Sequence, residues 1–368
     1  MKDILGLIGR EANLFEEDIV SHEDDLRELV TSSRFLVIGG AGSIGQAVVR
    51  EVFKRHPSVL HVVDISENNM VELVRDIRST LGYINGDFRT FALDCGSQEF
   101  QALLGSGGGY DYVLNLSALK HVRSEKDPFT LMRLIKVNVL NTIATIQQFR
   151  QGVVRKYFCV STDKAANPVN MMGASKRIAE MIVQDTARRF PERRIGIVRF
   201  GNVLDSSGSV VPLFREQIKK RMPITVTHPE ITRYFMSIGE AARLVIQAGA
   251  MSKNGEVFLL DMGSPVRIRD LALQMIELSG LIPEKDIPLQ FTGLRPGEKL
   301  YEELLIDPAQ SQPTRHPRIY SSEEPLPESE VLKKEIQQLS EAISKRDLNS
   351  ALDSMKRLVP EYNPENGQ

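Results

Sequence analysis

The stretch RFLVIGGAGSIGQAVV, residues 34–49, sets the fold class of this chain. Its first five residues, Arg34–Ile38, form an apolar run that predicts a buried strand, and the glycine-rich turn GGAGSIG follows at once. Ile44, Val48 and Val52 then recur at the spacing of one helix face. A strand, a tight glycine turn and a helix in direct succession are typical of the first unit of a parallel, doubly wound α/β sheet.

The alternation of strand and helix continues to residue 200. Apolar runs predict strands at 60–64, 88–94, 112–116, 156–160 and 195–200, and apolar stripes at helical spacing predict helices that include 128–149 and 171–190. After Gly201 repeated prolines break the pattern, which predicts a smaller, irregular lobe with helices near 238–250 and 268–279. We therefore expect an N-terminal helical arm (1–30), a Rossmann-type nucleotide-binding domain (31–200), mainly a substrate lobe (201–325), and C-terminal helices with a tail (326–368).

Composition narrows the functional classes. The chain has 368 residues, 42% of them hydrophobic, which is enough for one large α/β unit and a lobe. A net charge of −2 gives no electrostatic reason to expect nucleic acid as a partner. We find no run of the ~18 apolar residues that a membrane span needs, and no signal-peptide layout. The two cysteines, Cys95 and Cys159, have no metal-ligand spacing, so we expect a reduced, cytoplasmic protein without a metal site.

The glycine turn predicts a dinucleotide site. Gly39, Gly42 and Gly45 allow the backbone to turn tightly and to approach a pyrophosphate at the start of the helix. Asp64 ends the second strand, nineteen residues after Gly45, close to the ~20 typical of a carboxylate that binds the adenosine ribose. Because a carboxylate there would repel a 2′-phosphate, we predict NAD and not NADP. Asp94 either reaches the adenine or is an ordinary strand-end residue. The full set of expected cofactor contacts adds Ser43, Ile44, Ser66, Cys95, Ala118 and Lys176.

The stretch VSTDKAANPVNMMGASK, residues 160–176, carries the candidate chemistry. Thr162, Asp163 and Lys164 place a hydroxyl, a carboxylate and an amine at the carboxyl end of the fifth strand, the edge at which open α/β sheets bind ligands. Met172 and Lys176 follow on the next helix, four residues apart and therefore on one face. Thr162, Asp163, Lys164 and Lys176 are the candidate catalytic residues, and Met172 lies among them without a catalytic role.

The helix resembles that of the short-chain dehydrogenases, in which a Tyr-x-x-x-Lys pair binds the nicotinamide ribose and accepts a proton from the substrate. Lys176 matches the Lys, whereas Met172 stands at the Tyr position, and a thioether cannot do acid–base work. On this pattern alone, an inactive relative that only binds NAD or a sugar nucleotide stays possible.

Further segments make the resemblance more specific. STDKAANPVNMMGASKR, RFGNVLDSSGSVVPLF, ITRYFMSIGEA and TGLRPGEKLYEELL resemble the UDP-N-acetylglucosamine 4,6-dehydratases of bacterial surface-glycan and sialic-acid-like sugar synthesis, over residues 31–320. With Met172 at the Tyr position, the chain resembles the members of this group that retain the configuration at C5. The resemblance implies C4 oxidation, elimination of water across C5 and C6, and hydride return to C6. A GDP-sugar dehydratase and a UDP-sugar 4-epimerase are the alternative enzymes.

The resemblance also assigns roles. It implies Asp163 as the acid and Lys164 as the base. Lys164 can act as a base only if burial or a nearby cation lowers its pKa, and Lys120 is a candidate for that cation or for a ribose contact. We expect a homodimer or higher homo-oligomer that pairs through the helices 128–149 and 171–190. The expected contacts to a nucleotide-diphosphate N-acetylhexosamine are Lys120, Asn202, Val210, Pro212, Thr225, Arg233, Arg295 and Glu298.

Overall fold

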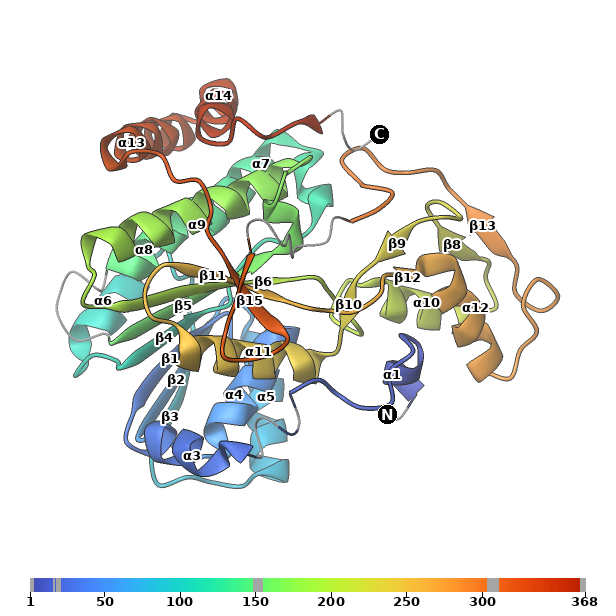
Figure 1. The fold of residues 1–368 in the computed structure, drawn as a ribbon, viewed down its shortest axis with the longest axis horizontal. Helices are drawn as coiled ribbons and strands as arrows, with labels where there is room; N and C mark the ends of the chain where they lie inside the picture. The colour runs from blue at the N-terminus through green and yellow to red at the C-terminus, as the bar shows by residue number, and fades with distance from the viewer. Residues whose placement is uncertain (1–2, 16, 18–20, 148–154, 303–310, 365–368) are drawn as a thin grey trace.

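A nine-stranded sheet forms the centre of the molecule in the computed structural model, which describes residues 3–15, 17, 21–147, 155–302 and 311–364 (Figure 1). The strand order is β14-β15-β11-β6-β5-β4-β1-β2-β3, and all pairs are parallel except β11–β15 and β14–β15. This confirms the predicted Rossmann-type α/β class. The strands are β1 (Arg34–Ile38), β2 (Val59–Asp64), β3 (Asp87–Ala92), β4 (Tyr112–Asn115), β5 (Lys156–Thr162), β6 (Arg194–Phe200), β11 (Glu256–Leu260), β14 (Ser311–Pro313) and β15 (Ile319–Ser322).

Helices cover both faces of the sheet because each has one apolar stripe to bury. One core cluster lies under α3 (Glu23–Thr31), α4 (Ser43–Phe53), α5 (Glu67–Thr80) and α11 (Ile238–Met251). A second lies on the opposite face, under α6 (Gln98–Ser106), α7 (Pro128–Ile135), α8 (Asn141–Ile146) and α9 (Met171–Arg189). The sheet order reverses direction between β1 and β4, so their carboxyl ends open a crevice at the place where such sheets bind nucleotides.

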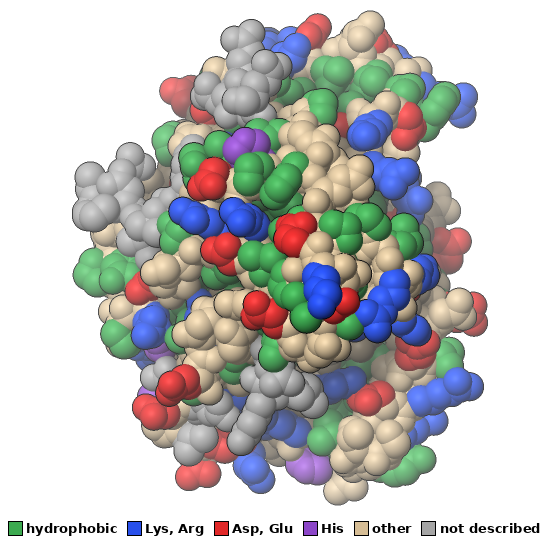
Figure 2. All heavy atoms as spheres, turned by 90° about the vertical axis from the view of Figure 1, so that its right-hand side faces the viewer, with side chains coloured by type: hydrophobic (Ala, Val, Ile, Leu, Met, Phe, Trp, Pro, Cys, Tyr) green, Lys and Arg blue, Asp and Glu red, His purple; other side chains and the backbone are tan. Residues whose placement is uncertain are grey.

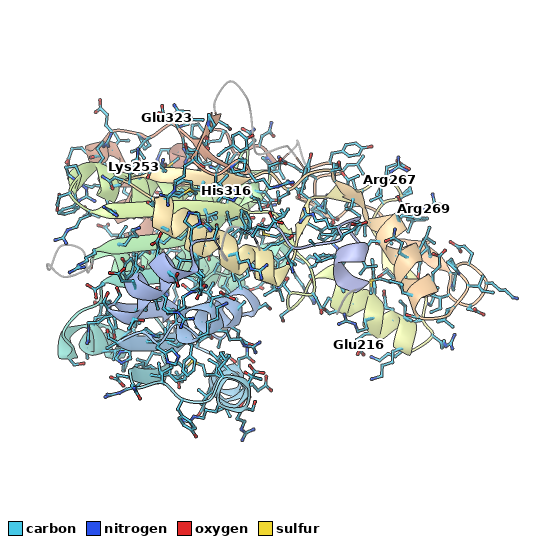
Figure 3. The ribbon with its side chains drawn as sticks, turned by 60° about the horizontal axis from the view of Figure 1, so that its bottom comes forward. Glu216, Lys253, Arg267, Arg269, His316 and Glu323 are labelled. Atoms are coloured by element: carbon cyan, nitrogen blue, oxygen red, sulfur yellow. The ribbon has the colours of Figure 1, made fainter. Side chains whose placement is uncertain are left out.

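A small lobe lies beside the carboxyl ends of the strands and has its own apolar cluster. It contains α10 (Val210–Lys219), α12 (Ile268–Leu278) and short strand pairs formed by β8 (Ile224–Val226) with β13 (Leu289–Phe291) and by β9 (Thr232–Arg233) with β12 (Val266–Arg267). Figure 3 shows Glu216, Arg267 and Arg269 on this lobe, apart from Lys253 and His316 on the large domain. Figure 2 shows acidic and basic side chains interspersed on the lobe end of the molecule.

The structure does not divide into two domains at residue 200, although we expected this from the sequence. Helix α11 packs on α4, and β11, β14 and β15 extend the large sheet beyond β6. Much of 201–325 therefore belongs to the nucleotide-binding domain. The expectation was wrong because β11, EVFLL, is a short apolar run that Gly255 precedes and Gly263 and Pro265 follow, so its pattern resembles that of a loop region. The end of the predicted helix 128–149 and the tail after residue 364 lie outside the described residues.

The N-terminal arm crosses from the small lobe to the large domain. Leu7, just after α1 (Asp3–Gly6), is buried in the lobe cluster, whereas Phe15 and Val30 are buried in the cluster under α4 and α11. Between them Arg10 pairs with the fully buried Glu240 at the start of α11. The arm is thus part of the packing of both halves.

The C-terminal helices α13 (Ser329–Lys345) and α14 (Leu348–Leu358) pack on α9. Sixteen of the nineteen residues of α9 are buried within this one chain. The face of the helix 171–190 through which we expected a homodimer is therefore already covered, because the chain supplies its own helical pair there. Homo-oligomer formation itself stays a prediction, and any such contact has to use other surfaces or displace α13 and α14.

The run Pro128–Ile146 is long and apolar enough to cross a membrane by length and composition alone. It comprises α7, the π-helical segment Lys136–Leu140 and α8, and half of it is buried inside the molecule. Its helices pack against α9 on one face of the sheet. This is the position of a covering helix in a Rossmann-type domain, which accounts for its apolar composition.

Candidate active site

The glycine turn after β1 has the close approaches that demand glycine. Gly39 has a φ of +75°, and a Cβ there would lie 2.7 Å from the backbone nitrogen of Ser117. A Cβ on Gly45 would lie 2.2 Å from the carbonyl oxygen of Gly39. Gly42 is the N-cap of α4 and offers no side chain to the helix amides. The first amides of α4 are thus left to a ligand, which fits a pyrophosphate.

Asp64 ends β2 beside this turn, as predicted. Its carboxylate accepts hydrogen bonds from the backbone amides of Ala41 at 3.0 Å and Ser66 at 2.9 Å. Ser66 is the N-cap of α5, and its side chain accepts from the amide of Asn69. The carboxylate is therefore held at the mouth of the glycine turn, at the position that a ribose contact requires.

Asp94, Cys95 and Ala118 lie on loops at the same edge of the sheet. Strand β3 ends at Ala92, so Asp94 follows the strand and does not end it as expected. Its Oδ1 accepts from Asn141 Nδ2 at 3.0 Å, which anchors the loop to α8. Burial raises the pKa of the Cys95 thiol, which indicates a small packed side chain. Ala118 is exposed after β4.

Asn138 organises this loop, and sequence reasoning missed it. It lies in the π-helical segment between α7 and α8 and is buried. Its side chain bonds both the amide and the carbonyl of Leu119, at 2.9 and 3.0 Å, and donates to Ser175 Oγ at 2.9 Å. A π segment within an apolar helix often marks a functional site, but the sequence pattern alone does not reveal it. Asn138 thus connects the loop after β4 to helix α9.

Thr162, Asp163 and Lys164 lie together at the end of β5. Thr162 Oγ1 donates to Asp163 Oδ1 at 2.8 Å, and Lys164 Nζ donates to the same oxygen at 3.0 Å. The Asp163 side chain is 3% exposed. Its other oxygen, Oδ2, is buried and has no hydrogen-bond partner in the described part of the chain. A buried carboxylate oxygen without a partner is a costly feature that a bound hydroxyl would satisfy.

A second carboxylate, from Glu302, reaches Lys164 from the small lobe. Glu302 Oε1 lies 3.3 Å from Lys164 Nζ and 3.3 Å from Arg233 Nε. Burial acts to lower the pKa of Lys164, but Asp163 and Glu302 outweigh it, and the pKa is raised. The condition that we set for a base is therefore not met in this arrangement. We expected Lys120 as a candidate for the cation that lowers the pKa of Lys164, but the cation that acts in this way is Arg233. Burial lowers the pKa of Lys120 itself.

Met172 and Lys176 lie on the first turns of α9, and both are buried. Lys176 Nζ donates to the carbonyl oxygen of Val160 on β5 at 2.7 Å, so the amine lies against the strand that leads to Asp163. The amide of Met172 donates to Glu125 Oε1 at 2.8 Å. Burial raises the pKa of Glu125, although the amides of Met172 and Met171 act against this rise. Glu125 thus caps the helix that presents Met172.

The expected sugar-nucleotide contacts divide into two groups. Asn202 is on β7 (Asn202–Val203), paired with β10 (Phe235–Met236), and its Nδ2 is a buried donor for which the described residues offer no acceptor. Arg233 lies 3.6 Å from Glu298, so the structure brings these two expected substrate contacts together. The residues of the second group are not held at the site by such contacts. Thr225 Oγ1 accepts from Gln217, Arg295 is exposed on a turn, and Val210 and Pro212 begin α10.

Fold and site together define a class of protein. A parallel sheet with a glycine turn after its first strand, an acid after its second and a lysine on the helix after its fifth is the arrangement of extended short-chain dehydrogenases. Solved structures that share this fold hold NAD.

The profile of the family described as "Polysaccharide biosynthesis protein" matches residues 35–324, and the chain belongs to this family. Capsular polysaccharide biosynthesis protein CapD of Staphylococcus aureus is 42% identical over 304 residues, which are 82% of this chain and 49% of CapD. The chain thus spans about half the length of CapD and of the probable polysaccharide biosynthesis protein EpsC of Bacillus subtilis. A UDP-glucose 4-epimerase of Rickettsia prowazekii is 33% identical over 73% of this chain and 76% of that protein. The solved structure of Pen from Bacillus thuringiensis has a TM-score of 0.72 and 31% identity, and covers 81% of this chain and 91% of Pen.

Proposed function

We propose that the chain is an NAD-dependent nucleotide-sugar 4,6-dehydratase that acts on UDP-N-acetylglucosamine and retains the configuration at C5. The observation that carries this proposal is the pair Asp163 and Lys164 at the end of β5, with one buried carboxylate oxygen left without a partner. An elimination needs an acid and a base close together, whereas a binding module needs neither. Membership of a polysaccharide biosynthesis family agrees with a sugar-nucleotide substrate.

The residues of the cofactor crevice fit NAD. The glycine turn and the first amides of α4 would hold the pyrophosphate, Asp64 the adenosine ribose, and Lys176 the nicotinamide ribose. The cofactor supplies a hydride acceptor for C4 and a hydride donor for C6. Because the same hydride returns, the protein has to keep the dinucleotide bound throughout the reaction.

Asp163 serves twice in this mechanism. Its Oδ2 takes the proton of the C4 hydroxyl, while Thr162 orients the other oxygen through the 2.8 Å bond. The resulting carboxylic acid then donates that proton to the departing 6-hydroxyl. A hydroxyl such as that of Thr162 is too weak a base near neutral pH to replace the carboxylate. Met172 shapes the sugar pocket and carries no proton.

Lys164 removes the C5 hydrogen, which the C4 ketone has made acidic, and returns this proton to C5 when the hydride adds to C6. The amine has to be neutral to remove the hydrogen, and its two carboxylate neighbours favour the ammonium form. Substrate binding therefore has to change the surroundings of Lys164 before elimination. Protonation of Asp163 in the first step removes one of these carboxylate charges. The diphosphate of the substrate alters the surroundings of the other, Glu302, because Arg233 and Asn202 are suited to bind the diphosphate and Arg233 contacts Glu302.

Asp163→Asn and Lys164→Met test these roles. We expect each to reduce dehydration by the ~10²–10⁴-fold typical of an acid–base group while NAD binding is kept. Lys164→Met should also stop exchange of the C5 hydrogen with deuterated solvent. If the variant still exchanges C5 at the rate of the unmodified protein, Lys164 is not the base.

A 4-epimerase is the second candidate, favoured by the Rickettsia prowazekii relative. Incubation with UDP-N-acetylglucosamine and mass spectrometry of the product separates the candidates. Loss of one water supports the dehydratase, an isomer of equal mass supports the epimerase, and an unchanged substrate supports a regulator that only binds it. GDP-N-acetylglucosamine, tested in parallel, decides the base of the nucleotide. We propose that the enzyme is cytoplasmic and homo-oligomeric. Size-exclusion chromatography with light scattering measures its oligomeric state.

A further inference from the structure

Glu302 is a buried carboxylate that the mechanism above does not use. Its side chain is 6% exposed, and one oxygen, Oε1, contacts both Lys164 Nζ and Arg233 Nε at 3.3 Å. The two cations come from different parts of the molecule, because Lys164 follows β5 of the large sheet and Arg233 ends β9 of the small lobe. Glu302 is therefore the point at which the proposed base and the proposed diphosphate ligand meet.

The charges around Glu302 do not balance. Asp163 and Glu298 add two further carboxylates, the first on Lys164 at 3.0 Å and the second on Arg233 at 3.6 Å. Three carboxylates thus share two cations in a largely buried site. When a diphosphate attracts Arg233, Glu302 keeps Lys164 as its only cation of this set, while more negative charge arrives nearby. Arg233 contacts Glu302 directly at 3.3 Å, so its withdrawal acts more strongly on Glu302 than on Lys164 and favours transfer of a proton from Lys164 to Glu302. The protonation of Asp163 in the first step acts in the same direction, because it removes the other carboxylate that holds the ammonium form of Lys164.

We propose that Glu302 is a positioning residue that couples the diphosphate site to Lys164. In the free chain it holds the ammonium group of Lys164 and the guanidinium group of Arg233 together. When the substrate diphosphate draws Arg233 away, one proton passes from Lys164 Nζ to Glu302 Oε1. The charged pair becomes an amine and a carboxylic acid, no proton enters from solvent, and the amine is ready to take the C5 hydrogen. This inference rests on the proposed function and identifies what starts the elimination.

Glu302→Gln is the informative variant, because glutamine keeps the shape and cannot accept the proton. The proton of Lys164 then has to leave to solvent, so we expect kcat at pH 7 to fall about 100-fold, within the range for a group engaged in proton transfer. The loss should shrink as the pH rises towards 9, which gives kcat a rising limb that the unmodified protein lacks. Glu302→Asp keeps a carboxylate and should restore the flat profile at a lower kcat.

Glu298→Gln is the matched control. Glu298 contacts Arg233 but is not paired with Lys164, so its loss should raise KM and leave the pH profile of kcat unchanged. Thermal melting and the bound NAD content show that each variant is folded. A Glu302→Gln variant whose pH profile of kcat is flat, or matches that of Glu298→Gln, overturns this proposal. The proposed function still holds in that case, provided that the unmodified protein dehydrates its substrate. An unmodified protein that releases no dehydrated product overturns the proposed function, and this inference with it.

Discussion

The ion pair between Arg10 and Glu240 tests whether the N-terminal arm holds the two halves of the molecule together. Arg10 Nη1 lies 2.7 Å from Glu240 Oε2, and the side chains are 16% and 0% exposed. Nη2 of Arg10 also donates to the carbonyl oxygens of Phe235 and Met262. One arm residue thus contacts the start of α11, a strand of the β7–β10 pair and the segment after β11.

Arg10→Ala leaves the Glu240 carboxylate buried without a cation. Breaking a buried pair from one side costs about 3–5 kcal/mol. Glu240 keeps hydrogen bonds from the amides of Leu14 at 2.9 Å and Ser237 at 2.8 Å, so each of its two oxygens still has a donor. We therefore expect the lower end of the range, a decrease of about 3 kcal/mol in the free energy of unfolding.

Urea unfolding followed by far-ultraviolet circular dichroism measures this change. Arg27→Ala is the control, because the Arg27 side chain is 59% exposed and lies 3.7 Å from Glu23, and such pairs are worth about 0–1 kcal/mol. Adding Glu240→Gln to Arg10→Ala removes the buried charge and should recover at least half of the loss. A single variant as stable as Arg27→Ala, or a double variant no more stable than the single, would refute the buried-charge argument.

Four further predictions follow from other contacts. Asp64→Ala should weaken NAD binding and reduce discrimination against NADP, and release of mostly NADP from the denatured, unmodified protein would contradict the assignment of Asp64. Met172→Leu should retain much of the activity, with a product whose ring proton couplings show retained C5; a variant as inactive as Asp163→Asn would contradict the shape role. Burial, with Arg194 and Arg315 nearby, lowers the pKa of Lys156 from 10.5 to about 8. Between these two pH values the unfolded chain binds more protons than the folded chain, so the free energy of unfolding rises with pH. Relative to Lys156→Met, the unmodified protein should gain about 3 kcal/mol between pH 8 and 10.5 in urea unfolding, and parallel curves would contradict this. A chain ending at Pro325 loses the cover of α9, so light scattering should detect self-association, and a monodisperse monomer would contradict that expectation.

The order of elements up to β6 and the cofactor turn were predictable from the sequence because they depend on local patterns. A strand, a glycine turn and a helix in succession leave few alternatives, and an acid at the end of the next strand follows at a regular distance. The grouping of Thr162, Asp163 and Lys164 was likewise predictable, because adjacent residues at a strand end have to lie together. Their catalytic roles stay predictions.

Only the tertiary structure decided the rest. Glu302 meets Lys164 because the small lobe folds back over the end of β5, and no spacing in the sequence encodes that contact. Strand β11 joins β6, and α13 and α14 cover α9, because apolar surfaces left open by one part of the chain are buried by another that is distant in sequence. A local pattern shows that a face is apolar, but the segment that buries it is selected by the packing of the whole chain.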